Sequence, residues 1–169
     1  TVTYLKDGEP THHIDLAVYS STSDGQTQLA RGRESDPKAD RIWEASEAEE
    51  LTNLINDQFK DDDSNQFRRV VRALKRWRDE KIGHKNVPSI GLTVSAYNWF
   101  SPSYDDSVDA KPRDLISIRN LVNQMLANWN GSRLEVELPV ASYADLFERM
   151  TQIQMDDFKS KLETLRDAL

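Results

Sequence analysis

Residues 67–78 read FRRVVRALKRWR, a pattern that is typical of a helix packed on a core. At about 100° per residue, its apolar residues fall on one side of a helix and its cations cover the remainder. The apolar stripe consists of Phe67, Val70, Val71, Leu74 and Trp77. The pattern predicts an amphipathic helix over residues 64–82 that packs one face on a core.

Further helical patterns lie on both sides of this segment. We expect helices over residues 37–45, 48–59, 88–100 and 114–129, and a last helical segment over 143–169 with a break near Thr151. Ser64 is suited to a helix start, and Gly83 and Gly131 are suited to helix ends. Residues 133–138 alternate apolar and charged side chains, which predicts a short strand between helices.

The N-terminal residues follow a different period. Residues 2–5 and 14–19 predict two strands of a hairpin with Asp7-Gly8 as turn residues, and residues 26–31 predict a third strand. The expected fold class is therefore α+β, with a β-hairpin remnant of a sheet over residues 1–34 and a mainly helical bundle over residues 35–169. So small a sheet is marginal by itself, and we expect further strands upstream of Thr1.

Composition excludes several classes of protein. The chain has 169 residues, enough for one domain of ordinary size, and no window approaches the ~20 apolar residues of a membrane span. It contains no cysteine, which removes disulfides, thiolate catalysis and cysteine-bound metals and suits a cytoplasmic location. The 22 Lys and Arg against 29 Asp and Glu give a net charge of −7, which argues against broad capture of nucleic acid.

Three cations gather on one flank of the helix predicted at residues 67–78. Arg68, Arg72 and Lys75 fall within about 60° of one another. Such a flank can seat phosphates, and lysine suits a compact point-charge contact with a triphosphate. By pattern alone, the favoured interpretation is a solvated cationic face paired with acidic neighbours such as Asp79.

A carboxylate in the second predicted strand is the next candidate. Asp15 projects from the middle of an otherwise apolar run. Hard divalent cations prefer oxygen ligands, and phosphoryl-transfer sites gather carboxylates around two such ions. One carboxylate is not enough for that site, and a strand aspartate that faces water is the alternative. We interpret His12 and His13 as structural, since adjacent strand residues face opposite ways.

Residues 13–19 (HIDLAVY), 35–38 (SDPK) and 68–77 (RRVVRALKRW) occur in this order, followed by residues 88–94 (PSIGLTV) and 145–151 (DLFERMT). Taken together, these segments resemble the cGAS/DncV-like nucleotidyltransferases of bacteria. Members of that family join nucleoside triphosphates such as ATP or GTP into cyclic di- or trinucleotide signals in anti-phage defence. The resemblance implies a Pol-β-like nucleotidyltransferase sheet at the N-terminal side and a helical second half.

The resemblance also implies roles for individual residues. Asp15 is similar to the third metal-binding carboxylate of the family, which completes a two-magnesium site, with Mn²⁺ as the alternative ion. Lys75 resembles the lysine that holds the donor triphosphate, and Ser89 resembles the serine at the next helix start that touches the same phosphates. Independently, a helix N-terminus presents free N–H groups and a positive dipole end, which suits Ser89 for a phosphate contact.

The Gly-Ser motif and the first Asp-x-Asp pair of this family are absent from the sequence. We therefore expect a C-terminal portion of the enzyme that needs an N-terminal catalytic segment and is inactive alone by this mechanism. Proteins of the same defence operon are further expected partners. Two other functions stay open: an RNA-extending nucleotidyltransferase, and a non-catalytic helical adaptor whose hairpin pairs with a partner's sheet. Activation of the enzyme by nucleic acid that binds residues 68–85 is a further alternative, although the negative net charge argues against it.

Overall fold

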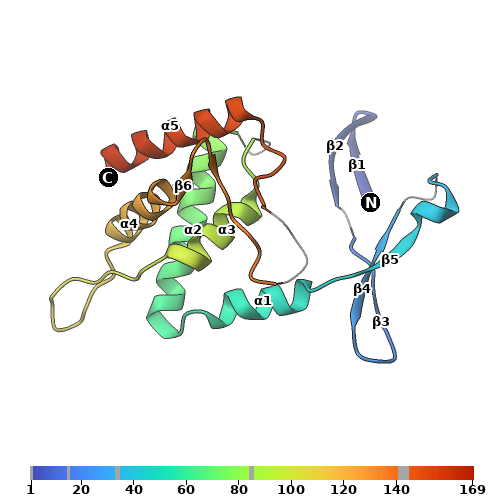
Figure 1. Cartoon of the computed structure of the whole chain (residues 1–169), viewed down its shortest axis with the longest axis horizontal. Helices are drawn as coiled ribbons and strands as arrows, with labels where there is room; N and C mark the ends of the chain where they lie inside the picture. The colour runs from blue at the N-terminus through green and yellow to red at the C-terminus, as the bar shows by residue number, and fades with distance from the viewer. Residues whose placement is uncertain (1, 15, 33–34, 84–85, 141–144) are drawn as a thin grey trace. The chain divides into compact units, whose positions relative to one another are not determined.

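The computed structural model describes residues 2–14, 16–32, 35–83, 86–140 and 145–169. Strands come first and helices follow, so the expected α+β class is confirmed (Figure 1). The chain divides into two compact units, residues 1–49 and 50–169. None of the described helices is long and apolar enough to cross a membrane.

The first unit begins with the predicted hairpin. β1 (Val2–Lys6) pairs with β2 (Glu9–Ile14) in antiparallel register. Asp7 and Gly8 both have positive φ, which is the conformation that a two-residue hairpin turn of the favoured hand requires. The strand predicted over residues 14–19 is wrong in extent, because β2 ends at Ile14 and residues 16–18 belong to no strand.

A second sheet follows in the first unit. β3 (Tyr19–Ser21), β4 (Thr27–Arg31) and β5 (Ile42–Ala45) form an antiparallel sheet in the order β3-β4-β5. The helix predicted over residues 37–45 is wrong: Lys38–Asp40 form a single 3₁₀ turn, and β5 pairs with β4 from Gln28–Ala45 to Arg31–Ile42. Pairing with a neighbouring strand outweighs the weak local helical pattern. All three strands of this sheet belong to the first compact unit, which ends at Glu49.

Helices make up most of the second unit. Its helical elements are α1 (Ala48–Asp57), α2 (Asp61–Lys81), α3 (Ser89–Trp99), α4 (Asp114–Ala127) and α5 (Gln152–Ala168), of which α1 begins just before the division. The N-cap of α2 is Lys60, so Ser64 lies inside the helix and not at its start as predicted. At the other end, Gly83 has a φ of +95° and donates its N–H to the Arg78 carbonyl, which confirms its role as a helix end.

The chain between α4 and α5 differs from the prediction. β6 (Trp129–Asn130) and β7 (Arg133–Leu134) form a minimal hairpin, and Gly131, with a φ of +57°, lies in its turn instead of ending a helix. The predicted strand over residues 133–138 is therefore limited to its first two residues.

The last predicted helical segment starts later than expected. Its residues 143–144 lie outside the described residues, and residues 146–149 form turns. Thr151 is the N-cap of α5: its Oγ1 accepts the N–H of Gln154, and its own N–H donates to Gln154 Oε1. This capping box confirms the predicted break near Thr151.

Helices α2, α3, α4 and α5 share one hydrophobic core. Four residues of the predicted stripe on α2 are buried, namely Phe67, Val70, Val71 and Leu74, whereas Trp77 is half-buried at its edge. The rings of Phe59, Phe67 and Phe100 pack together with centroids 5.0–5.6 Å apart. The core thus fixes α2 on one side and leaves its cationic flank outside.

Candidate functional site

The structure describes two of the three predicted site residues. Lys75 lies on α2 and Ser89 is the first residue of α3, and these two helices pack against each other. Within the described ranges, no hydrogen bond or ion pair joins Lys75 to Ser89. Asp15, the predicted metal ligand and catalytic carboxylate, lies outside the described residues.

Lys75 is half-buried at the edge of the α2 stripe. Burial is the main cause that lowers the pKa of its ammonium group, and the nearby charge of Arg78 lowers it further. No carboxylate of the described residues forms an ion pair with Lys75. An ammonium group that has lost water without gaining a counter-charge is held at a free-energy cost, which a bound anion relieves.

Arg78 fixes the connection between the two helices. Its side chain is buried, donates Nη1–H to the Val87 carbonyl at 2.7 Å, and donates Nε–H to Asp79 Oδ1 at 2.8 Å. A hydrogen bond from a charged donor to a carbonyl in the core is stronger than a neutral one. Arg78 therefore holds the residue just before Pro88 against the end of α2, and with it the start of α3.

The N-terminus of α3 has no side-chain cap. Its N-cap residue is Pro88, which cannot supply one, and Ser89 is exposed. The Ser89 carbonyl accepts a hydrogen bond from the Thr93 hydroxyl at 3.0 Å, and the Ser89 hydroxyl takes no part in this hydrogen bond. Unsatisfied N–H groups and the positive end of the helix dipole favour an anion at such a terminus.

Two of the sequence segments quoted above meet in the core. A Cβ atom placed on Gly91 would lie 2.3 Å from Cε1 and 2.6 Å from Cζ of Phe147. Phe147 is completely buried, and its ring centroid lies 5.7 Å from that of Phe158 on α5. Only glycine allows the first turn of α3 to approach this ring so closely, and Gly91 therefore sets the position of Ser89 two residues earlier.

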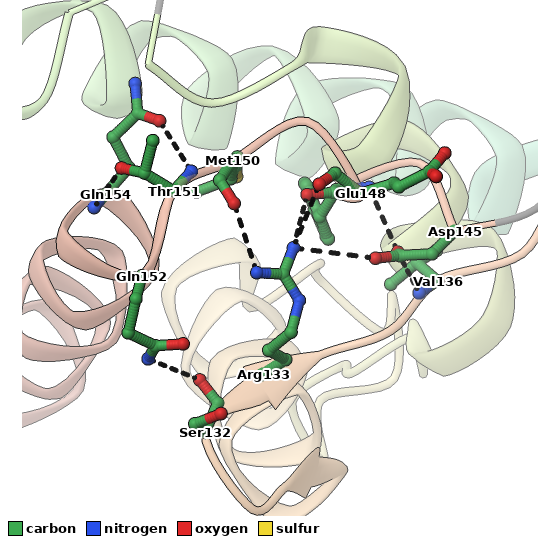
Figure 2. Close-up of polar contacts among 10 residues, drawn as sticks. Ser132, Arg133, Val136, Asp145, Glu148, Met150, Thr151, Gln152 and Gln154 are labelled. Carbon is green, nitrogen blue, oxygen red and sulfur yellow. Dashed lines mark hydrogen bonds and ion pairs between the residues drawn. The ribbon is translucent and has the colours of Figure 1, made fainter.

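Arg133 on β7 holds the turn that carries Phe147 (Figure 2). It donates Nη2–H to the Phe147 carbonyl at 2.7 Å and Nη1–H to the Met150 carbonyl at 3.1 Å. Asp145, at the start of the turn, forms an ion pair with Arg133 at 3.9 Å, and its Oδ1 accepts the N–H groups of Val136 at 2.9 Å and Phe147 at 3.0 Å. We call this set of contacts the Arg133 clamp. It was not expected from the sequence, because contacts to backbone carbonyls have no residue pattern.

A cavity of about 440 Å³ opens beside the N-terminal half of α2. Arg68, Arg69 and Arg72 line it from α2, and residues 109–112 line it from the segment between α3 and α4. Of the three cations predicted on one flank, the structure thus brings Arg68 and Arg72 to this cavity, while Lys75 is not part of its lining. Arg68 and Arg72 are exposed, as the interpretation of a solvated face expects, but neither forms an ion pair within the described part of the chain.

Comparison of the sequence with protein-family models and with curated proteins gives no match. The described residues also form no group of three or more potential metal ligands among His, Asp and Glu. The roles of Asp15, Lys75 and Ser89 therefore stay predictions of the resemblance, to which the structure adds the surroundings of Lys75 and Ser89.

Proposed function

We propose that this chain is the C-terminal part of a cytoplasmic nucleotidyltransferase that joins nucleoside triphosphates into a cyclic oligonucleotide signal. In this proposal the second unit holds the triphosphate through Lys75 and Ser89. Residues 1–34 are the proposed last strands of the catalytic sheet. The observation that carries the proposal is the half-buried Lys75 ammonium group, whose pKa is lowered by burial and which has no carboxylate partner in the described structure.

Each residue has a defined task toward the triphosphate. Lys75 supplies a compact positive charge, and its attraction to a phosphate is stronger in a partly dehydrated position than in bulk water. Ser89 supplies a hydroxyl group at a helix terminus whose N–H groups favour the same anion. Both contacts stabilise negative charge that moves onto the pyrophosphate leaving group as the new phosphodiester bond forms.

Asp15 is the proposed ligand of Mg²⁺, or of Mn²⁺ as the alternative. A bound divalent ion supplies charge neutralisation at the phosphates and lowers the pKa of the attacking 3′-hydroxyl. A single carboxylate provides few of the oxygen ligands that such an ion takes, so this part of the proposal depends on an upstream segment with further carboxylates.

The test uses the full-length gene product with ATP, GTP and Mg²⁺, followed by phosphatase treatment and chromatography of the products. We expect a phosphatase-resistant cyclic nucleotide from the wild-type protein. Lys75→Met should lower kcat/KM by about 100-fold or more, because one charge at the transferring phosphates is lost. Ser89→Ala should lower it by about tenfold, as expected for one hydrogen bond to a charged group.

Arg76→Met is the matched control. Arg76 is the next residue on α2, is exposed, and pairs with Glu80 at 2.7 Å, so its loss should leave kcat/KM close to the wild-type value. Equal activity of the Lys75 and Arg76 variants would remove Lys75 from the proposed site. A lengthened polymer in place of a cyclic product would favour the RNA-extending enzyme.

The non-catalytic adaptor is the second candidate, and one observation favours it. Several large apolar residues of the first unit keep half or more of their surface exposed, namely Leu5, Leu16, Val18 and Trp43. Leu5 lies on β1 and Trp43 on β5, and exposed apolar residues on strands suit pairing with another sheet, whether from the same protein or from a partner. A folded full-length protein that incorporates no nucleotide would support the adaptor and overturn the enzyme.

A further inference from the structure

The cavity beside α2 is separate from the residues proposed to hold the triphosphate. It is lined by Asp62, Asn65, Arg68, Arg69 and Arg72 and by residues 109–112, and neither Lys75 nor Ser89 contributes to it. All of its lining residues belong to the second unit. Its function can therefore be considered independently of the proposed enzyme activity.

The cations that line the cavity differ in whether they pair with a carboxylate. Arg69 donates Nε–H to Asp114 Oδ2 at 2.6 Å and Nη2–H to Asp114 Oδ1 at 3.0 Å, so its charge is balanced by a two-bond ion pair. Arg68, Arg72 and Lys111 form no ion pair within the described residues. Three cations around one cavity are thus available to an anionic ligand.

The spacing of these cations suits a phosphate group. Arg68 and Arg72 are four residues apart on α2, so they share one side of the helix about 6 Å apart along its axis. Lys111 lines the same cavity from the segment between α3 and α4. A guanidinium group donates two parallel hydrogen bonds to phosphate oxygens, and lysine adds a point charge from a second direction.

Both walls of the cavity are fixed. The side-chain amide of Gln66 donates to the Ser103 carbonyl at 2.9 Å and accepts the Ser103 N–H at 2.9 Å. The Tyr104 hydroxyl donates to Asp63 Oδ1 at 2.6 Å. Within the loop, Asp105 Oδ1 accepts the Lys111 N–H at 2.9 Å. These contacts hold the segment that carries Lys111 against α2, so little ordering remains to be done when a ligand binds.

The two acidic residues of the lining indicate what else the ligand carries. Asp62 and Asp109 can accept hydrogen bonds from hydroxyl groups. They also oppose a long polyanion, as do the acidic residues next to the lining in the sequence, Asp61 and Asp63 on α2 and Asp105 and Asp106 in the loop. The cavity has a volume of about 440 Å³, which lies within the range of small-molecule sites, and it is open to solvent, since every lining residue except Arg69 is exposed.

We propose that this cavity binds a phosphorylated small molecule that carries hydroxyl groups, such as a sugar phosphate or a nucleoside phosphate. Arg68, Arg72 and Lys111 hold the phosphate, and Asp62 and Asp109 accept hydrogen bonds from the hydroxyl groups. A phosphate with a polyol attached can pair with the cations of the lining and donate hydrogen bonds to its carboxylates, whereas inorganic phosphate can pair only with the cations.

The probes are ribose 5-phosphate and adenosine diphosphate, with ribose as the neutral control, titrated into the 169-residue chain by calorimetry. We expect saturable binding of at least one phosphorylated probe, no binding of ribose, and at least tenfold weaker binding by Arg68→Gln/Arg72→Gln. Arg76→Gln, an exposed change on the same helix, should bind like the wild type. If the double variant does not fold, Lys111→Gln on the other wall makes the same comparison.

Three results would overturn the proposal. The first is no saturable binding of either phosphorylated probe up to about 10 mM, which corresponds to a free energy of binding weaker than about −3 kcal/mol. The second is binding that Arg68→Gln/Arg72→Gln and Arg76→Gln reduce equally. The third is tight, strongly salt-dependent binding of duplex RNA that the double variant abolishes, because such behaviour would assign these arginines to nucleic acid. Since none of these readouts uses nucleotide incorporation, they are independent of the test of Lys75.

Discussion

Replacement of Gly91 by alanine tests whether α3 is placed by its contact with Phe147. Inside a helix, Gly→Ala by itself stabilises by about 0.5–1 kcal/mol. At Gly91 the added Cβ would lie 2.3 Å from Phe147 Cε1, far inside contact distance, and the ring is completely buried. Overpacking of this kind costs about 1–3 kcal/mol. We therefore expect Gly91→Ala to lower the free energy of unfolding by about 1–2 kcal/mol.

The assay is equilibrium unfolding in urea, followed by circular dichroism, with Asn98→Ala as the matched control on the same helix. Asn98 is exposed, so this change should be neutral or slightly stabilising through helix propensity. Phe147→Leu removes the ring atoms that the new Cβ would meet. The double variant should therefore be more stable than the sum of the single effects predicts, with a coupling of about 1 kcal/mol.

If Gly91→Ala is as stable as Asn98→Ala, or if the coupling with Phe147→Leu is zero, the contact with Phe147 does not place α3. A further consequence concerns the proposed site, because Ser89 lies two residues before Gly91. If the proposed function holds, Gly91→Ala in the full-length protein should also raise KM for the nucleotide, whereas Asn98→Ala should not.

Two other perturbations have defined outcomes. Arg133→Met should lower the free energy of unfolding by about 2 kcal/mol, since two carbonyls lose a charged donor, and Arg133→Lys should recover part of the loss; urea unfolding of both variants measures this. For Asp114, the hydrogen bond from Arg69 holds the carboxyl pKa below its ordinary value of 3.8. The ion pair therefore stabilises the protein fully above pH 3.8, and the contribution is lost as the pH falls through the lowered pKa. Asp114→Asn should be less stable than the wild type at neutral pH, and the difference in urea midpoint should shrink as the pH drops below 3.8; a constant difference would contradict the assignment.

Features with a local cause were predicted well from the sequence. The stripe on α2 follows from a 3.6-residue period that a single helix must satisfy, and four of its five residues are buried. The Asp7-Gly8 turn is equally local, because two adjacent residues provide the positive φ values.

Features with a non-local cause were missed or wrong. Residues 42–45 pair with β4, a partner that their own sequence does not identify, and the predicted helix there is wrong. The same holds for the candidate sites. Sequence spacing placed Arg68, Arg72 and Lys75 on one flank, but only the folding back of the segment before α4 shows that the first two share a cavity with Lys111. The contact between Gly91 and Phe147 likewise joins two segments that no periodic pattern connects.

The paired hydrogen bonds between Gln66 and Ser103 have a practical consequence for ligand discovery. They join residues far apart along the chain, so Lys111 reaches the cavity only after α2 has met the segment between α3 and α4. A synthetic peptide of α2 would keep its three lining arginines but would lack Lys111 and the rest of the lining from residues 109–112. Ligand binding to such peptides would therefore depend on net charge alone, and a search for the natural ligand must use the folded protein.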